Sequence, residues 1–243
     1  MELQEKLLKE IVPFNNPLIV EIGAADGEGT RKLLDLFGEA KIYSFDADPR
    51  AIECHKDFVK DDRCTLINKA VSNEEGTMEF YLSNKTSQFD AKLQRENRKE
   101  IYEKATKTLT EVLPEYTPST TTHGGWFYSS TILENQYNGA RGLNWNSKVE
   151  VDVTTLDKWC DDTDLNHIDL LWTDVEGAER RMLEGAKNSL RFTNYVLLEY
   201  GLTDMFPEAM SRADTIECMK NYGFSLYADY SDIDLLFKRD DIV

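Results

Sequence analysis

The chain has 243 residues, and 28 lysines and arginines against 45 aspartates and glutamates give it a formal net charge of -17. A chain this acidic is not expected to have the basic face that neutralises phosphates. We therefore expect neither a nucleic-acid partner nor binding to an anionic membrane surface. Hydrophobic residues make up 41% of the sequence, which is enough for a sizeable core and excludes wholesale disorder. The four cysteines are scattered without a CxxC pair, so we expect neither a disulfide framework nor a zinc site.

Membrane and secretion signals are weak in this sequence. A helix that spans a bilayer needs roughly 18 apolar residues, and no apolar run of the chain approaches that length. The first ten residues are charged throughout and lack the apolar stretch of a signal peptide. We therefore expect a cytoplasmic protein.

Short apolar runs alternate with helical patterns along the first half of the chain. Leucines at helical spacing predict a short amphipathic helix over about residues 2–11. The pattern that follows predicts strands over 18–22, 41–45 and 64–67, and helices over 27–37 and from Pro49 onward. Strands that alternate with helices of this length favour a parallel sheet covered on both faces.

The second half resumes this alternation and ends differently. We predict strands over 168–172 and 195–199, helices over 176–187 and 207–222, and a final strand pair over 224–228 and 234–238. Two strands joined by so short a turn must be antiparallel, because a parallel pair needs a long crossover. The predicted fold is therefore α/β, with a mostly parallel sheet that ends in an antiparallel hairpin.

The alternation breaks between about residues 84 and 148, where charged and Thr/Ser/Gly-rich stretches replace it. A structureless loop of this length is improbable in a compact domain unless it has a function. We predict one domain over 1–243, in which 84–148 is an inserted lid or substrate-recognition segment.

The junctions between strands and helices carry the candidate binding residues. Gly23 and Gly27 follow the first strand, where glycines permit a sharp turn and the close approach of a ligand, although an ordinary tight turn would look the same. Asp46 ends the second strand, about 20 residues further on, where a carboxylate suits ribose hydroxyls. Helix capping is the alternative role of Asp46, and Asp48 is better placed for it.

Carboxylates also follow two strands of the second half. Ligands of open parallel sheets bind beyond the carboxyl ends of the strands, so Asp174 and Glu199 should face the same crevice as Gly23 and Asp46. Asp174 and Glu176 have an alternative role at the start of a helix, where acidic groups are favourable.

Several blocks of this sequence resemble the FkbM-type methyltransferases. They are Val20–Gly27, Phe45–Pro49, Asn68–Gly76, Val153–Asp157, Ile168–Glu179 and Met182–Ala186, and they cover most of the chain outside the insertion. The resemblance implies a class I, Rossmann-like methyltransferase with a seven-stranded sheet, S-adenosyl-L-methionine as cofactor, and O-methylation of a sugar, glycan or related metabolite. The cofactor site that it implies contains Glu21, Gly23, Ala24, Gly27, Asp46, Ala47, Ser72 and Asp174.

Methyl transfer to a hydroxyl needs a group that takes up the proton of the acceptor. We name Asp174, His123, Glu199 and Glu176 as candidates, with His123 in the insertion. The three carboxylates could alternatively hold Mg²⁺, but we predict no metal site. Of the remaining histidines, we expect His55 at the surface and His167 in a structural role.

Two other functions stay open on the sequence alone. A nicotinamide-dependent oxidoreductase would use the same crevice, although the GxGxxG pattern is absent. A non-catalytic protein could retain the nucleotide pocket and hold a partner with its insertion. If the protein is an enzyme, we expect its partner to be a small-molecule or glycan acceptor. The sequence does not indicate the oligomeric state.

Overall fold

The computed structural model describes residues 8, 9, 12, 16–85, 130–134, 143–201 and 203–242. Most of the predicted N-terminal helix and most of the insertion therefore lie outside the described residues. Among the described helices, none has the length and apolar character needed to cross a bilayer.

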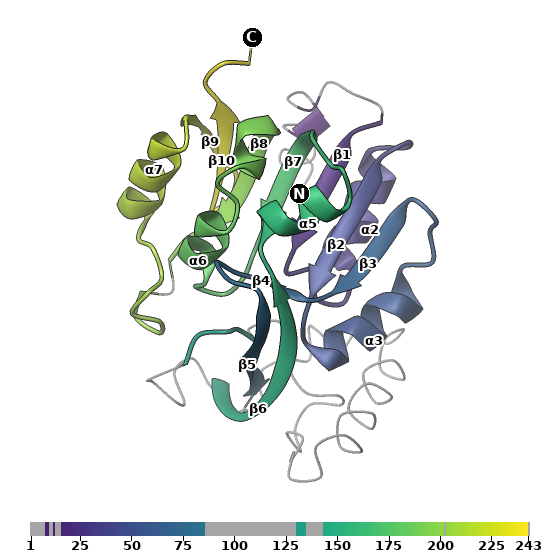
Figure 1. The fold of residues 1–243 in the computed structure, drawn as a ribbon, viewed down its shortest axis with the longest axis vertical. Helices are drawn as coiled ribbons and strands as arrows, with labels where there is room; N and C mark the ends of the chain where they lie inside the picture. Colours follow the sequence, from purple (N-terminus) through teal and green to yellow (C-terminus); the bar gives the residue numbers. More distant parts are fainter. Residues whose placement is uncertain are drawn as a thin grey trace.

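A seven-stranded sheet forms the centre of the molecule (Figure 1). Its strands stand in the order β3-β2-β1-β7-β8-β10-β9, and β10 alone runs antiparallel to both of its neighbours. The strands are β1 Leu18–Ile22, β2 Lys41–Asp46, β3 Cys64–Asn68, β7 Ile168–Thr173, β8 Thr193–Glu199, β9 Phe224–Asp229 and β10 Asp234–Arg239. All seven predicted strands are confirmed, and so is the α/β class with its terminal antiparallel hairpin.

Both faces of this sheet are buried because successive side chains of a strand point to opposite sides. Leu197 of β8 joins a cluster with α2, whereas Val196 and Leu198 join a second cluster with α5 and α6. The helices are α2 Glu28–Leu36, α3 Pro49–Phe58, α5 Leu156–Asp162, α6 Glu179–Glu184 and α7 Arg212–Asn221, and a 3-10 turn spans Ser189–Phe192.

Two predicted helices begin later than the sequence pattern indicated. The helix expected from residue 176 begins at Glu179, because Glu176 and Gly177 have left-handed backbone angles that a helix cannot continue. The helix expected from residue 207 begins at Arg212, since Ser211 forms a capping box with Asp214. A smaller difference is that α2 ends at Leu36, one residue before the predicted end, because Phe37 has extended backbone angles.

A second sheet was not predicted. It has three strands in the order β4-β6-β5, namely β4 Ala70–Val71, β5 Gly76–Lys85 and β6 Leu143–Thr154. The two longer strands reach into the predicted insertion, about 84–148, because β5 runs to Lys85 and β6 begins at Leu143. These strands pack on the loop before α7, where Trp145 meets Phe206 with ring centroids 5.8 Å apart.

The contact at Gly185 shows how tightly the second sheet joins the first. A Cβ atom added at Gly185, at the end of α6, would lie 1.9 Å from the backbone oxygen of Ser72, next to β4. We expect Gly185→Ala to lower the free energy of unfolding by about 1–3 kcal/mol, because the backbone must move apart. Gly38→Ala is the matched control, since a Cβ atom added at Gly38 would meet nothing within 4 Å. Urea denaturation of both variants measures the difference, and equal stability would contradict this packing.

Candidate active site

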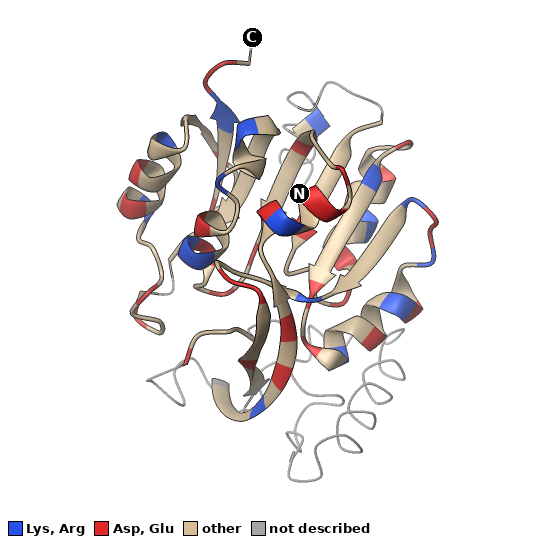
Figure 2. Ribbon diagram, viewed as in Figure 1, with Lys and Arg blue, Asp and Glu red and all other residues tan. Residues whose placement is uncertain are grey.

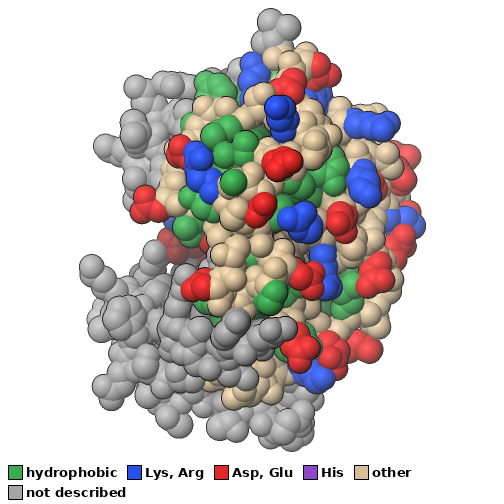
Figure 3. Space-filling model, turned by 90° about the vertical axis from the view of Figure 1, so that its left-hand side faces the viewer, with side chains coloured by type: hydrophobic (Ala, Val, Ile, Leu, Met, Phe, Trp, Pro, Cys, Tyr) green, Lys and Arg blue, Asp and Glu red, His purple; other side chains and the backbone are tan. Residues whose placement is uncertain are grey.

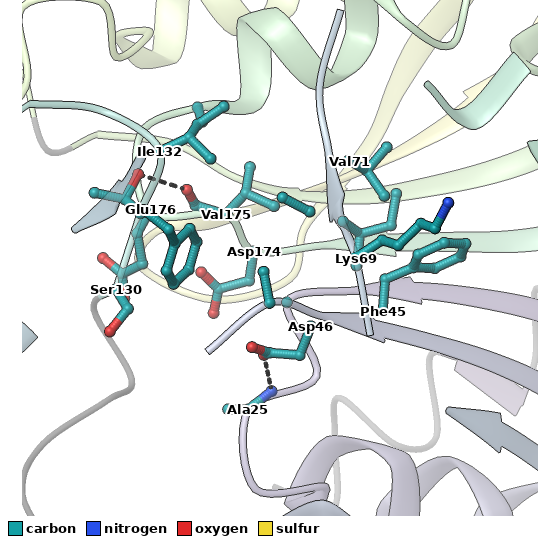
Figure 4. Close-up of a pocket in the computed structure, with 17 residues that line it drawn as sticks. Ala25, Phe45, Asp46, Lys69, Val71, Ser130, Ile132, Asp174, Val175 and Glu176 are labelled. Carbon is teal, nitrogen blue, oxygen red and sulfur yellow. Dashed lines mark hydrogen bonds between the residues drawn. The ribbon is translucent and has the colours of Figure 1, made fainter. Parts of the chain in front are cut away.

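A cavity opens at the carboxyl ends of the central strands. It lies where the strand order reverses, between β1 and β7, which is where ligands bind in open α/β sheets. Figure 4 shows Asp46 and Asp174 pointing into the same space from different strands. The lining residues are Ile22, Gly23, Ala25, Phe45, Asp46, Ala47, Lys69, Ala70, Val71, Phe80, Ser130, Thr131, Ile132, Asp174, Val175, Glu176 and Ala178.

Asp46 holds the loop after β1 in place. One carboxylate oxygen accepts a hydrogen bond from the backbone N–H of Ala25 at 2.7 Å (Figure 4), and the other accepts one from the backbone N–H of Asp48 at 2.8 Å. The backbone N–H of Ala47 also bonds this carboxylate, so about one of its roughly four acceptor positions is left for a ligand hydroxyl. Burial raises the pKa of Asp46 to about 7, and the charge of Asp48 adds to this.

Asp48 itself caps α3, as expected from the sequence. It accepts a hydrogen bond from the backbone N–H of Arg50 at 2.9 Å, with Pro49 in the first turn. Asp46 is therefore not needed as a cap and is left to organise the cavity.

Gly23 lets the loops after β1 and β7 meet. Its φ is +89°, and a Cβ atom at this position would lie 1.8 Å from the backbone oxygen of Asp174. The N–H of Asp174 in turn donates to the oxygen of Ile22 at 2.9 Å. Any larger side chain at Gly23 would push the two loops apart and displace Asp174.

Three carboxyl groups gather beside the cavity. Oxygens of Asp174, Glu176 and Glu199 all lie within 4.8 Å of one another. Burial, followed by the charge of Asp174, raises the pKa of Glu199 to about 12. Burial raises the pKa of Asp174 as well, but the hydrogen bond from Glu199 lowers it. At neutral pH the shared proton therefore lies on Glu199, which donates it in a hydrogen bond to Asp174.

This carboxyl group cluster has the oxygen chemistry that a hard divalent cation prefers. Proximity alone fits proton uptake equally well, and the expectation that the protein holds no metal stays a prediction. Glu199 itself is not among the lining residues, so it reaches the cavity through Asp174.

Glu21, which was expected to contact the cofactor, does not line the described cavity. It is 4% exposed and accepts hydrogen bonds from the hydroxyls of Thr30 at 2.5 Å and Ser44 at 2.7 Å, behind the loop after β1. Burial raises its pKa to about 7. The structure gives Glu21 a bracing role, and cofactor contact at this residue stays a prediction.

His55 belongs to the same buried network, so its predicted surface position is wrong. It is 1% exposed, and its Nε2 atom lies 3.0 Å from the hydroxyl oxygen of Thr30. Burial lowers its pKa to about 4, which keeps the ring neutral. His167 has the expected structural position, with Nε2 at 2.8 Å from Asp169.

The remaining predicted cofactor residues divide into two groups. Ala47 lines the cavity, together with Gly23, Asp46 and Asp174. Ala24, Gly27 and Ser72 are not among its described lining residues. A Cβ atom at Gly27 would lie 2.5 Å from a methyl group of Val59, and the buried backbone N–H of Ser72 donates to Thr154 at 3.0 Å.

Lys69 and the 130–132 segment also line the cavity. Lys69 was not expected there from the sequence, whereas residues 130–132 belong to the insertion predicted as a lid or substrate-recognition segment. Thr131 pairs with Tyr81 of β5 through two backbone hydrogen bonds of 2.8 and 3.1 Å, and this pairing brings the end of the insertion to the cavity. In the sequence, the run of hydroxyl side chains over Ser129–Thr131 is the signal that points to this segment. His123 lies outside the described residues, so its role stays a prediction.

A buried ion pair fixes Ser130 at the cavity. Arg50 is 0% exposed and forms a bidentate pair with Asp48, with N–O distances of 2.9 and 2.6 Å. The hydroxyl of Ser130 donates to Asp48 at 2.7 Å and accepts from the backbone N–H of Ser83 at 3.0 Å. The first turn of α3, β5 and the insertion therefore share one polar network.

Comparison with known proteins identifies the family. The model of the methyltransferase FkbM domain matches residues 21–226. The chain belongs to the FkbM methyltransferase family. It is 27% identical over 194 residues to the 2-O-methyltransferase NoeI of Sinorhizobium fredii (strain NBRC 101917 / NGR234), a match that covers 79% of this chain and 66% of the relative, just under two thirds of its length.

Solved structures with similar folds include two methyltransferases. Methyltransferase FkbM from Methylobacillus flagellatus KT has a TM-score of 0.46 and 11% identity, over 92% of this chain and 44% of the other. A putative rRNA-methylase from Clostridium thermocellum has a TM-score of 0.48 and 12% identity, over 98% and 93% of the two chains.

The buried pair of Arg50 and Asp48 makes a testable contribution to stability. We expect Arg50→Met to lower the free energy of unfolding by about 3–5 kcal/mol, because it leaves the buried Asp48 carboxylate without its partner. The control is Arg212→Met, which breaks an exposed pair with Asp229 and should cost at most about 1 kcal/mol. Urea denaturation tests both, and a small effect at Arg50 would contradict the anchoring role.

Proposed function

We propose that this protein is an S-adenosylmethionine-dependent O-methyltransferase that acts on a hydroxyl of a sugar, glycan or related small molecule. The family supports methyl transfer, and the name of the relative, 2-O-methyltransferase, supports a hydroxyl acceptor. The observation that carries the proposal is the meeting of Gly23, Asp46 and Asp174 at one cavity.

The donor chemistry of this cavity fits the cofactor. The remaining acceptor position of Asp46 suits a ribose hydroxyl, and the apolar side chains of Ala47, Ala70 and Val71 offer a surface for the adenine ring. When bound, S-adenosylmethionine supplies an electrophilic methyl group on a sulfonium ion. A cationic group is favoured near the carboxylates of Asp174 and Glu176.

Asp174 and Glu176 carry the proton chemistry in this proposal. The acceptor hydroxyl must lose its proton during or after attack, and a carboxylate within hydrogen-bond distance accepts it. Protonated Glu199 orients Asp174 for this step and does not itself act as the base. Glu199 therefore positions the group that receives the proton.

The surface supports a small-molecule or glycan acceptor over a nucleic acid. Lysine and arginine side chains alternate with acidic ones on the described face in Figure 3, and the described helices carry both signs (Figure 2). A nucleic-acid site needs a continuous basic surface.

A cytoplasmic location is part of the proposal, because all four cysteines are unpaired, as a reducing compartment favours.

The direct test combines binding and transfer. Isothermal titration with S-adenosylmethionine, S-adenosylhomocysteine and NAD should show binding of the first two only. A radiolabelled methyl-transfer assay over free sugars and glycan fragments should then yield O-methylated product. Binding of NAD instead would favour an oxidoreductase, and cofactor binding without any transfer would favour a non-catalytic protein.

Asp46 should make cofactor binding depend on pH. Ionised Asp46 accepts a ribose hydroxyl, so the affinity for S-adenosylhomocysteine should rise as the pH rises through about 7, the pKa of Asp46 in the free protein, and level off above it. Asp46→Asn should bind about 1–3 kcal/mol more weakly and lose this pH dependence. Titration calorimetry from acidic to alkaline pH measures both, and equal pH profiles would remove Asp46 from the ribose role.

Asp174 should matter more for turnover than for binding. In Asp174→Asn the side chain no longer takes up a proton, so kcat should fall by roughly 10²–10⁴-fold, the usual contribution of general base catalysis. The dissociation constant of S-adenosylhomocysteine should change far less. Rate assays and calorimetry on the same preparation separate the two effects, and equal losses would make Asp174 a binding residue only.

A further inference from the structure

The turn that carries Glu176 has an unusual backbone. Glu176 has a φ of +53° and Gly177 a φ of +93°, two successive left-handed residues between β7 and α6. For a residue with a side chain, this conformation is strained and persists only where the surroundings impose it. Something near the turn must therefore stabilise it.

Glu179, the first residue of α6, makes the stabilising contacts. Its Oε1 atom accepts hydrogen bonds from the backbone N–H groups of Val175 and Gly177, each at 3.2 Å. These two residues flank Glu176, so one carboxylate oxygen closes the turn on both sides of it. Glu179 is 3% exposed, so water cannot replace these hydrogen bonds at low cost.

Packing restrains the same turn from a second direction. A Cβ atom at Gly177 would lie 2.9 Å from Cδ2 of Phe206, and Phe206 is itself fully buried against Trp145 of β6. The backbone of the turn is thus held between an aromatic wall and the Glu179 carboxylate. The second sheet, through Trp145, contributes to this wall.

We propose that Glu179 is a positioning residue, whose side chain holds the 175–177 turn so that Glu176 stands beside Asp174 in the cavity. The catalytic consequence rests on the proposed function, whereas the clamp itself is a property of the folded chain. Glu179 is not among the lining residues of the cavity, so it acts through the turn.

The competing explanation of Glu179 is electrostatic. An acidic group in the first turn of a helix is favourable because it faces the positive end of the helix dipole. Burial raises the pKa of Glu179 to about 7, so its charge is incomplete at neutral pH and explains the residue less well than its acceptor oxygen does. The two explanations make opposite predictions for two conservative variants.

Glu179→Gln retains the length and the acceptor oxygen but removes the charge. Glu179→Asp retains the charge but shortens the side chain by one methylene, so it cannot span both N–H groups. If Glu179 is a clamp, Glu179→Gln should retain wild-type protection of the Val175 and Gly177 amides in hydrogen–deuterium exchange, and Glu179→Asp should lose about tenfold or more. Glu184→Gln, at the exposed end of the same helix, is the control and should change neither amide.

Kinetics of the same variants test the consequence for Glu176. In the radiolabelled transfer assay, the kcat of Glu179→Asp should fall at least about tenfold, because the carboxylate of Glu176 is displaced from its place beside Asp174. The KM for S-adenosylmethionine should rise less than kcat falls, since the contact of the cofactor with Asp46 is retained and Glu176 supplies only part of the attraction for the sulfonium ion. Glu179→Gln should restore kcat to the wild-type range, which a general loss of stability would not do.

The exchange and kinetic results separate failure of this proposal from failure of the proposed function. Unchanged amide protection in Glu179→Asp, or equal loss of protection in both variants, would overturn the clamp. If the wild-type protein methylates no acceptor, the proposed function fails, and the exchange data still decide whether Glu179 holds the turn.

Discussion

The close contact between the loops after β1 and β7 is the constraint on which the rest of the site depends. Gly23 leaves no room for a side chain against the backbone oxygen of Asp174, and the two loops are joined by the hydrogen bond from Asp174 to Ile22. Asp46 then ties the far side of the β1 loop through Ala25. Three strands far apart in sequence thereby share one cavity, which a nucleoside cofactor requires.

Acidic residues near this cavity have separate tasks that their surroundings decide. Glu21 is enclosed by hydroxyl groups and braces the β1 loop from behind, whereas Asp46 uses backbone N–H groups and faces the cavity. Glu199 is buried beside Asp174, so the pair shares a proton. Glu179 lies outside the cavity and stabilises the turn next to it. Some of the acidic residues behind the net charge of -17 therefore lie inside the fold. Burial raises the pKa of several of these carboxyl groups to about 7 or above.

The second sheet connects the insertion to the catalytic side of the molecule. Its strand β5 pairs with the 130–132 segment, and Arg50 fixes Ser130 through Asp48. Phe206 meets Trp145 of β6 and limits the turn after β7. Arg50 and Phe206, both fully buried, thus tie the second sheet to the loops around the cavity.

The sequence by itself determined the strands of the central sheet and their order along the chain, since apolar periodicity and Pro49 at the start of α3 act on neighbouring residues. It also placed Gly23, Asp46, Asp174 and Glu199 at one edge, because the carboxyl ends of parallel strands must coincide. Tertiary structure alone decided the burial of His55 and Glu21, the late start of α6 and the second sheet. These depend on contacts between residues distant in the chain, such as Gly177 with Phe206, for which local patterns carry no signal.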